Sequence, residues 1–478
     1  MKRLTRRAFL NTTGLALGAA LAACAPATPT PQPQPTARPA ATTLPQATKP
    51  AATAVPPATA VPQPTRPVQP VTLTYYSWGD KEKWDSEKHC FEPFLAANPQ
   101  IKIDFQGYPF AQYWQKILIG MSAGDPPDVF RMNYWKSHAF YARQVIVCLD
   151  PYFQKDGFDP VKAFGDPKIQ GASVYQGKWY GTPRGNTGND IVFYNRNVFD
   201  KAGIPWPEKT PKWTWNDLLS ISRQLTKDTN GDGKTDVWGF DTGKLANDWN
   251  GGQALVWGWG GELFSQDGTK CLINTPEAIE GLQFLADLRN KHGVAPYPAQ
   301  LPEGTGDAFM TGKVAMRADG GYMVNVYKII KDFDWSIATI PAGPVSQVAR
   351  CAANATVITK GSKHADVSWQ LLKHINAEAT VKCEALEGLW PPNTLSAMNA
   401  DWYLKRNTPP YDLSATVPGK LVEGRAPELH PWADQIRSIM MAEFDPVWAG
   451  KKTIREVAPI IERRVNEVLQ KKELPELA

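Results

Sequence analysis

The stretch from residue 25 to residue 70 sets the first limit on how this chain can fold. It holds 14 prolines in 46 positions, interleaved with Ala, Thr and Gln, and it contains no aromatic and no acidic residue. Such a composition cannot bury enough apolar surface to offset the entropy lost on ordering. We therefore expect a disordered, extended tether at ~3.1 Å per residue, with the folded part confined to residues 71–478. A Pro-rich ligand for another protein module is the alternative interpretation.

Residues 1–24 have the pattern of an export signal. A basic start without acids leads into a short apolar run that ends in Leu21-Ala22-Ala23-Cys24. This order is typical of a secretory signal peptide, and the run is too short to span ~30 Å of hydrocarbon. Thr5–Leu10 resembles a twin-arginine signal, and the final four residues resemble a bacterial lipobox. The resemblance implies lipidation of Cys24 and a membrane anchor; a chance cysteine is the alternative.

The net charge of +5 is carried by the first 70 residues. Residues 1–23 carry +4 and residues 25–70 carry +3, which leaves −2 for Val71 onward. A nearly neutral body argues against nucleic acid as a partner, because that partner requires a clustered basic face. After residue 24 no stretch approaches the ~18 apolar residues of a membrane-spanning helix.

From Val71 onward the hydrophobic pattern alternates between strand and helix periods. Residues 71–76 and 101–105 alternate with period two, whereas 82–97 and 113–121 show helical spacing. A short strand follows at 128–130. Strands and helices in this order predict an α/β, doubly wound unit with a parallel sheet. Further helices are predicted at 276–291, 366–377 and 453–470, the last with a capping box of Thr453 and Glu456.

Catalytic signatures are missing from the sequence. It has no Gly-x-Ser-x-Gly, His-Glu-x-x-His, Gly-x-Gly-x-x-Gly or Cys-x-x-Cys motif. A pair of catalytic carboxylates cannot be located by spacing alone. Five cysteines follow Cys24, and export permits disulfides. Their connectivity is open, and an odd number leaves at least one outside an intrachain disulfide; these are Cys90, Cys148, Cys271, Cys351 and Cys383.

Residues 228–240 resemble the first part of a calcium-binding loop. Oxygen-bearing side chains occupy positions 1, 3, 5 and 9, Gly233 supplies the turn at position 6, and Gly239 stands where an EF-hand has Glu. The sequence thus predicts half of an EF-hand-like site, with calcium in a structural role. A polar surface turn is the alternative. The predicted ligands are the side chains of Asp228, Asn230, Asp232 and Asp236 and the backbone carbonyl of Lys234.

Tryptophan is unusually frequent in the folded part. All 18 tryptophans lie between Trp78 and Trp448. Most must serve ordinary packing, but an indole face also matches the apolar face of a sugar ring. In an exported chain with few motifs, carbohydrate binding becomes a leading hypothesis. A secreted enzyme that cleaves carbohydrates is the competing class.

A set of motifs in order resembles the extracellular solute-binding proteins of family 1, which serve ABC importers of sugars and include maltose-binding-protein-like chains. The resemblance covers about 71–478. The motifs are Gly177–Pro183, Val192–Gly203, Thr214–Leu218, Phe309–Met316 followed by Gly320-Gly321-Tyr322, Ile340–Pro344 and Thr359–His364.

The resemblance implies a two-lobe periplasmic-binding-protein fold of type II, with discontinuous lobes, a hinge and an interlobe cleft. Lobe 1 would comprise 71–186 and about 350–388. Lobe 2 would comprise about 187–349 and 389–478. The ligand would lie where the carboxyl ends of strands converge.

Candidate ligand contacts follow from the resemblance at positions where the local motif aligns. Trp402 and Arg406 are four apart and are expected to share one helical face. Tyr322 stands where relatives usually have Trp, and with Trp78 it is expected to stack on the ligand. The full set is Trp78, Asp80, Lys81, Asn133, Trp135, Asp248, Trp249, Trp257, Trp259, Tyr322, Trp390, Trp402 and Arg406.

The resemblance implies a non-catalytic receptor, lipid-anchored at the outer face of the cell membrane, on the periplasmic side where an outer membrane exists. It would bind a sugar or oligosaccharide as a monomer and deliver it to the transmembrane subunits of an ABC permease. A peptide or a glycerol phosphoester is the alternative ligand. A hydrolase would be favoured by a tight carboxylate pair beside the cleft.

Overall fold

The computed structural model describes residues 70–478, except 211, 249, 475, 476 and 478. The predicted signal peptide, Cys24 and all of the tether before Pro70 lie outside the described residues, as does Trp249. The described part belongs to one unit, Pro67–Ala478. Among its residues no helix combines the length and apolar character needed to cross a membrane.

The first elements form the predicted doubly wound unit. Strand β1 (Val71–Trp78) pairs in parallel with β2 (Ile101–Tyr108) and with β3 (Val129–Met132). The crossovers are α1 (Lys81–Ala97) and α2 (Phe110–Ser122). The Asp80 carboxylate accepts the Lys83 N–H and caps the start of helix α1, and Asn98 caps its end. The α/β prediction is confirmed.

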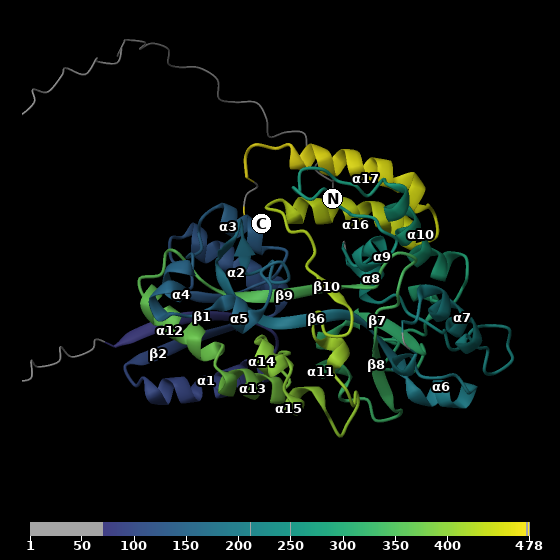
Figure 1. The fold of residues 1–478 in the computed structure, drawn as a ribbon, viewed down its shortest axis with the longest axis horizontal. Coiled ribbons are helices and arrows are strands. Elements are labelled where there is room, and N and C mark those ends of the chain that lie inside the picture. Colours follow the sequence, from purple (N-terminus) through teal and green to yellow (C-terminus); the bar gives the residue numbers. More distant parts are fainter. Residues whose placement is uncertain (1–69, 211, 249, 475–476, 478) are drawn as a thin grey trace, which may run out of the picture. The chain divides into compact units, whose positions relative to one another are not determined.

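Two long strands carry the sheet across the molecule. Strands β6 (Gly181–Asn195) and β9 (Val348–Ile358) pair antiparallel in the middle of the order β2-β1-β3-β9-β6-β7, as Figure 1 shows. The last part of β6 pairs instead with β7 (Met316–Gly320) and β8 (Trp335–Thr339), and β10 (Glu423–Arg425) pairs with β9.

The register of β6 against β9 shifts between Arg184 and Asn186 and again between Asn186 and Asn189. The lobe boundary predicted near 186 lies at this irregularity, and the one near 350 lies inside β9. We keep the names lobe 1 and lobe 2 for the predicted segments, whose bounds stay a prediction.

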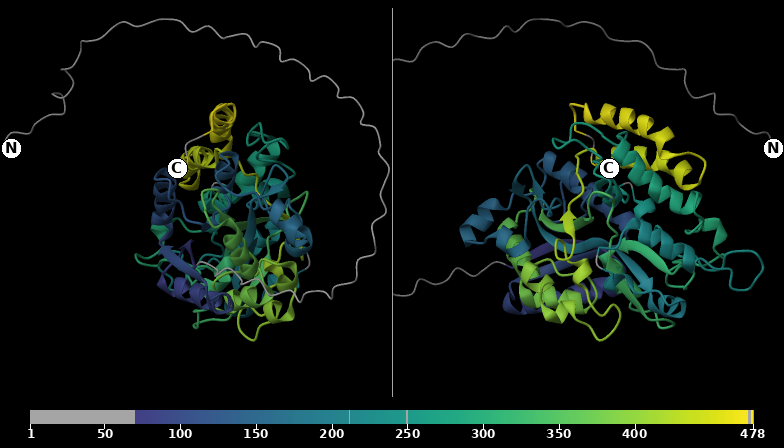
Figure 2. Two further views of the ribbon diagram at one scale, coloured as in Figure 1. Left: turned by 90° about the vertical axis from the view of Figure 1, so that its left-hand side faces the viewer. Right: turned by 45° about the vertical axis from the view of Figure 1, so that its right-hand side comes forward.

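Helices cover both faces of the sheet (Figures 1 and 2). The predicted helices at 276–291, 366–377 and 453–470 are confirmed as α10, α12 and α17, and Thr453 and Glu456 form the predicted capping box. The remaining helices and short strands are α3 (Ser137–Ala142), α4 (Asp150–Asp156), α5 (Pro160–Phe164), β4 (Val174–Tyr175), β5 (Lys178–Trp179), α6 (Arg196–Ala202), α7 (Trp215–Leu225), α8 (Lys244–Asn247), α9 (Gln253–Gly258), α10 (Pro276–Asn290), α11 (Val324–Tyr327), α12 (Ala365–Ile375), α13 (Glu378–Leu386), α14 (Leu395–Met398), α15 (Asp401–Leu404), α16 (Ala433–Trp448) and α17 (Ile454–Leu469).

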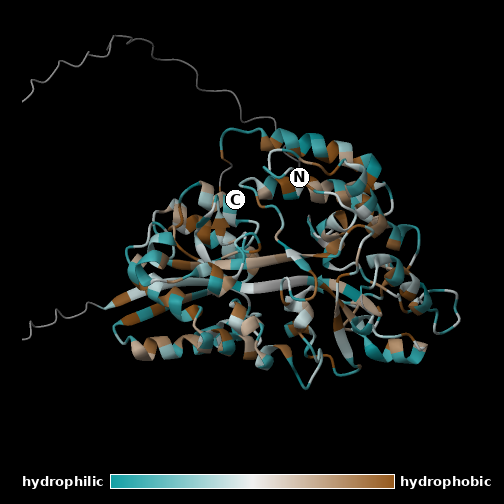
Figure 3. Ribbon diagram, viewed as in Figure 1, coloured by the Kyte–Doolittle hydropathy of each residue, from teal (hydrophilic) through white to brown (hydrophobic). Residues whose placement is uncertain are grey.

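Lobe 1 and lobe 2 have separate hydrophobic cores. In lobe 1, Leu73 and Val129 of the sheet pack with Leu372 of α12. In lobe 2, separate clusters form around β6, around α10 with α17, and around β8. Figure 3 shows hydrophobic colours on much of β9, whereas hydrophobic and hydrophilic colours alternate along α17. Separate cores are what two lobes that move as bodies require.

Among the described residues one disulfide is formed, and it lies within lobe 1. Cys90 of α1 is bonded to Cys383 of α13 across a sequence separation of 293 residues. Cys148, Cys271 and Cys351 are not in a disulfide. The pairing left open by the sequence is thereby assigned.

Candidate functional site

A small cavity opens between the two lobes. Its volume is ≈ 130 Å³, and its wall combines the end of α13 in lobe 1 with α11 and α15 of lobe 2. This volume is below the ~300 Å³ at which ligand pockets usually begin. A sugar chain would therefore need the lobes further apart than they stand here. Three predicted contact residues line the cavity: Trp390, Trp402 and Arg406.

Trp402 and Arg406 meet at the cavity by a different route from the one predicted. Helix α15 ends at Leu404. Arg406 follows in an extended segment and donates its backbone N–H to the Tyr411 carbonyl. The shared helical face is therefore wrong, although both side chains reach the same wall. Burial lowers the pKa of Arg406.

An aromatic stack adjoins the cavity. The guanidinium carbon of Arg131, on β3, lies 3.8 Å from the Trp78 ring centre and 3.5 Å from that of Trp390. Gly185 makes room for this approach: it has φ 60°, and a Cβ there would lie 3.2 Å from the Trp390 Cβ. One face of Trp78, which we predicted to stack on ligand, is thus occupied by Arg131 in this arrangement.

A buried polar network joins the lobes beside the two hinge strands, β6 and β9. We call it the Arg350 network. Arg350 of β9 donates two hydrogen bonds to Asp190 of β6, at 2.9 and 3.0 Å. Its Nη1 also donates to Asn250 at 3.1 Å and lies 3.7 Å from the Asp248 carboxylate. The Tyr134 hydroxyl donates to Asp248 at 3.0 Å.

This network spans the predicted boundary. Tyr134 follows β3 in lobe 1, whereas Asp248 follows α8 in lobe 2. Burial raises the pKa of Tyr134, so its hydroxyl stays a donor at neutral pH. The charge of Asp190 and its neighbours outweighs burial and raises the pKa of Arg350. Lys136 of lobe 1 adds an ion pair with Asp434 of α16 at 2.9 Å.

Tyr322 lies two residues after the end of β7, next to Gly321, which lines the cavity. Its hydroxyl donates to Asp319 at 2.9 Å, and the Lys244 ammonium lies 5.3 Å from its ring centre. Burial raises the pKa of Tyr322 and lowers that of Lys244. An aromatic face flanked by a cation and a carboxylate suits a polar ligand with an apolar ring face.

Comparison with known proteins identifies the family of this chain. The model of the bacterial extracellular solute-binding protein family matches residues 81–382. This chain belongs to that family. The ABC substrate-binding protein Lmo0181 of Listeria monocytogenes, solved in complex with cycloalternan, superimposes with a TM-score of 0.72 at 26% identity over 84% of this chain and 99% of that one.

Two further relatives of this solute-binding protein have similar coverage. A binding protein of Brucella abortus (strain 2308) is 25% identical over 408 residues, which are 84% of this chain and 93% of the relative. The sn-glycerol-3-phosphate-binding periplasmic protein UgpB of Escherichia coli (strain K12) is 25% identical over 424 residues, covering 79% and 88%. The predicted two-lobe fold and family are confirmed.

In this solute-binding protein, Asn133 and Trp135 are two further predicted contact residues, and both lie near the Arg350 network. Asn133 is buried, and its side-chain oxygen accepts the Trp135 N–H at 3.3 Å. Trp135 packs edge-on against Phe110, with its ring centre 6.0 Å away, and Arg437 of α16 lies 5.7 Å from the Trp135 ring centre. Both residues therefore lie where lobe 1 faces lobe 2.

Four predicted contact residues are placed elsewhere. Asp80 caps α1, and Lys81 forms an exposed ion pair with Asp85. Trp257 is only 2% exposed, and its indole N–H donates to Glu262. Trp259 lines a separate hollow beside α10 and α17. Trp257 lies in α9 and Trp259 directly follows that helix, and the structure brings neither ring to the interlobe cavity.

The loop predicted to bind calcium uses its carboxylates internally. Asp228 accepts the backbone N–H groups of Gly231 at 2.6 Å and Gly233 at 2.8 Å, and Asp236 accepts that of Thr229 at 2.6 Å. In the part of the chain that the structure describes, no group of three or more His, Cys, Asp or Glu is arranged to hold a metal. These hydrogen bonds use only part of the acceptor capacity of each carboxylate, and calcium binding by the loop stays a prediction.

Three central residues were missed by sequence reasoning: Arg131, Tyr134 and Arg350. The sequence did contain a signal for the two arginines, because each interrupts an apolar strand. Arg131 stands between Phe130 and Met132, and Arg350 stands between Ala349 and Cys351. A charged residue in a buried strand is rare unless it is paired or functional. Tyr134 carried no comparable signal.

Proposed function

We propose that this solute-binding protein captures a sugar or oligosaccharide between its lobes, as a monomer, and delivers it to an ABC permease. The observation that carries the proposal is the convergence of Trp390, Trp402 and Arg406 on one interlobe cavity. Indole rings offer flat apolar faces to a pyranose at little cost in rotamer entropy, and the guanidinium donates to its hydroxyls. The Listeria protein bound to cycloalternan supports this ligand class.

Ligand capture works through lobe closure. Each lobe supplies only part of the wall, so a ligand that contacts both lobes binds the closed form better than the open one. It shifts the equilibrium by that difference in affinity. The Arg350 network adds contacts that exist only when Tyr134 and Asp248 meet. The protein needs no reacting group for this task, and we infer that it is not an enzyme.

A glycerol phosphoester is the second candidate ligand. The observation in its favour is the likeness to the E. coli protein named for binding sn-glycerol 3-phosphate. Both candidates place the ligand in the same interlobe space. They differ in charge, which makes them separable by experiment.

A thermal-shift screen against neutral sugars, acidic sugars, oligosaccharides and glycerol phosphates tests the function. The best ligand should quench tryptophan fluorescence saturably and reduce the radius of gyration. Trp402→Ala and Tyr322→Ala should each weaken binding about tenfold, the equivalent of ~1.4 kcal/mol. Trp259→Ala, in the separate hollow, is the matched control and should leave affinity unchanged. Binding of peptides alone would overturn the sugar assignment, and steady release of reducing ends would overturn the receptor.

Anchoring through Cys24 is the second part of the proposal. A diacylated cysteine followed by a Pro-rich tether would hold the receptor at the membrane face where its permease lies. Cys24→Ala should be exported and recovered in the soluble fraction. Quantitative recovery of that variant with membranes would refute the anchor.

A structural calcium ion remains a proposal based on the loop sequence. Asp228, Asp232 and Asp236 would bind the ion through oxygen lone pairs that their hydrogen bonds to backbone amides leave available. An ion bound only by the folded state stabilises it by ~2.7 kcal/mol at a hundredfold excess over Kd. A chelator should lower Tm, and Asp232→Ala should remove the chelator effect. Identical melting with and without chelator would refute the site.

A further inference from the structure

The guanidinium of Arg131 is fully buried and lacks a hydrogen-bond partner. Its exposed fraction is 0%, and Nε, Nη1 and Nη2 contact no acceptor among the described residues. The indole N–H of Trp390, stacked on this guanidinium, is buried without an acceptor in the same way. Two neighbouring side chains therefore present N–H donors, and no acceptor meets them.

Glu87 attracts Arg131 electrostatically, but Glu87 and Glu384 form their hydrogen bonds with other groups, Arg184 among them. Glu87 accepts from Arg184 at 2.7 Å, from the Tyr75 hydroxyl at 2.5 Å and from Ser77 at 2.6 Å. Glu384 also accepts from Arg184, at 2.5 Å. Burial lowers the pKa of Arg131 to about 10, which leaves it protonated at neutral pH. Its charge is thus buried without a hydrogen-bonded counterion.

Such a group opposes folding, because a buried charge is unfavourable unless it is paired. Stacking between two indoles recovers part of the cost but leaves the in-plane N–H groups unmet. Natural chains keep costly features of this kind mainly where function requires them. The missing partner must be an acceptor, since every unmet group here is a donor. It should be negatively charged to neutralise the guanidinium.

We propose that Arg131 and the Trp390 indole N–H anchor an oxyanion on the ligand, either the carboxylate of an acidic sugar or a phosphate group. The inference rests on the proposed function, because it places the ligand in the interlobe space. Trp390 lines the cavity and also covers Arg131. Rotation of this side chain when the lobes part would expose the guanidinium edge, which binds carboxylate or phosphate with two parallel hydrogen bonds.

Matched neutral and anionic probes test the charge preference. We would measure glucose against glucuronate and glucose 6-phosphate, and glycerol against sn-glycerol 3-phosphate, by calorimetry. At least one anion should bind more than tenfold tighter than its neutral partner. The comparison of glucuronate with the phosphates identifies which oxyanion is preferred.

Arg131→Met should weaken the anionic probe by about ten- to hundredfold, the range of a charge-assisted hydrogen bond pair, and weaken the neutral probe much less. Arg131→Lys retains the positive charge but lacks the planar guanidinium that makes two parallel hydrogen bonds. Its affinity for the anionic probe should lie between those of wild type and Arg131→Met. Trp390→Phe removes the indole N–H while keeping a ring and should weaken the anion a few-fold. This variant also keeps the test intact should Arg131→Met fail to fold.

Stability separates this role from a structural one. Arg131→Met removes an unpaired charge, so Tm should stay or rise. Arg184→Met is the matched control, a buried arginine with two carboxylate partners, and its Tm should fall. A neutral sugar bound equally by wild type and Arg131→Met, with no anion preferred, would overturn the inference and spare the proposed function. Binding of no sugar and no glycerol derivative would overturn both.

Discussion

Two buried arginine clusters stabilise this solute-binding protein in different ways. One is the Arg184 cluster, formed by Arg184 with Glu87 and Glu384. The other is the Arg350 network at the hinge strands. The Arg184 cluster joins α1, α13 and β6 within lobe 1. The Arg350 network joins lobe 1 to lobe 2 through Tyr134 and Asp248.

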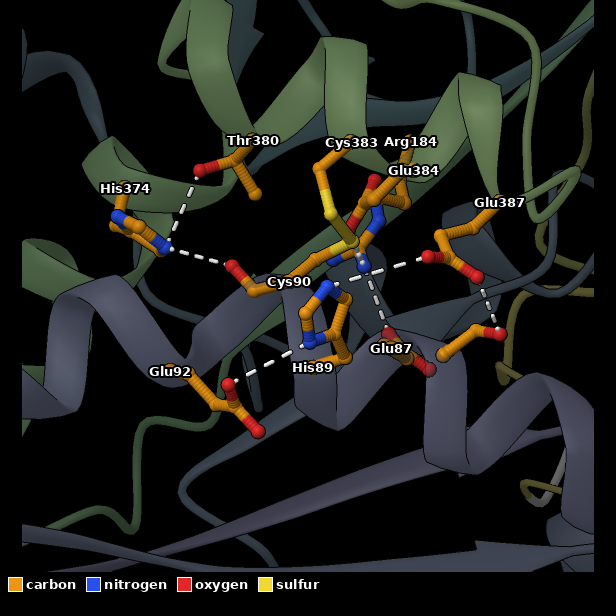
Figure 4. Close-up of a disulfide and its surroundings, with 11 residues drawn as sticks. Glu87, His89, Cys90, Glu92, Arg184, His374, Thr380, Cys383, Glu384 and Glu387 are labelled. Carbon is orange, nitrogen blue, oxygen red and sulfur yellow. Dashed lines mark hydrogen bonds and ion pairs between the residues drawn. A yellow bond between two sulfur atoms is a disulfide. The ribbon is translucent and has the colours of Figure 1, made fainter.

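The disulfide lies beside the Arg184 cluster. Cys90 lies one helical turn after Glu87, and Cys383 directly precedes Glu384, so the covalent bond and the ion pairs connect the same two helices (Figure 4). In the described part of the chain no disulfide joins the lobes, and beyond the backbone crossings they are held together by hydrogen bonds, ion pairs and packing. Lobe 1 is thus fixed internally, whereas the contact between lobes can break and re-form.

The largest effect should come from the Arg350 network. Arg350→Met leaves Asp190 buried without its partner, and breaking one side of a buried ion pair costs about 3–5 kcal/mol. Denaturant unfolding should show this loss. The double variant Arg350→Met with Asp190→Asn should recover part of it, because the orphan charge is gone. A loss below ~1 kcal/mol for the single variant would contradict the account.

The disulfide should matter for stability but not for ligand affinity. Cys90→Ser with Cys383→Ser frees a long loop in the unfolded chain and should cost about 2–4 kcal/mol. Because both residues lie in lobe 1, Kd for the best ligand should change less than twofold. Cys148→Ser is the control. A large loss of ligand affinity in the double variant would show that the Arg184 cluster and its disulfide also influence closure of the lobes.

The Arg184 cluster should impose a distinctive pH dependence. Burial raises the pKa of Glu384 from 4.5 to about 7, despite Arg184 beside it and with Glu87 opposing its ionisation. Between these values the folded protein holds a proton that the unfolded chain has lost. Stability from this group therefore falls as pH rises from 4.5 to 7, by up to ~1.4 kcal/mol per pH unit.

Glu384→Gln removes this titration. The unfolding free energy of the variant minus that of wild type should increase between pH 5 and pH 7. The subtraction is needed because His430 changes the unfolding free energy in the opposite direction. Burial lowers the pKa of His430 to about 4, so the stability that this residue contributes is lost as the pH falls below 6.5. A difference that stays flat across the window would contradict the raised pKa.

The sequence could predict much of the fold and less of the site. Period-two and helical patterns predicted β1, α1, β2 and α2 because each buries one face, and the Thr453 capping box marked the start of α17. The site depends on contacts between distant residues, such as Tyr134 with Asp248, and local periodicity contains no information about them. Tryptophans at 257 and 259 looked equivalent to Trp390 and Trp402 in sequence, but only the tertiary fold decides which ring is buried.

The smallest effect should reveal the most about closure. Tyr134→Phe keeps the ring and removes the hydroxyl that donates to Asp248 at 3.0 Å and contacts Arg350 at 3.3 Å. One such hydrogen bond contributes about 1 kcal/mol. Because this bond exists only when the lobes meet, its loss should favour the open form about fivefold and weaken ligand binding by a similar factor. Small-angle scattering should then show a larger radius of gyration without ligand.

Tyr141→Phe is the matched control for this last prediction. Its hydroxyl donates to the Ala172 carbonyl at 2.6 Å, a buried bond of the same kind that lies entirely within lobe 1. It should lower Tm at least as much as Tyr134→Phe and leave both Kd and the radius of gyration unchanged. Equal losses of affinity in the two variants would mean that the Tyr134 hydroxyl contributes only general stability. A loss confined to Tyr134→Phe would assign the closing contact to the Arg350 network.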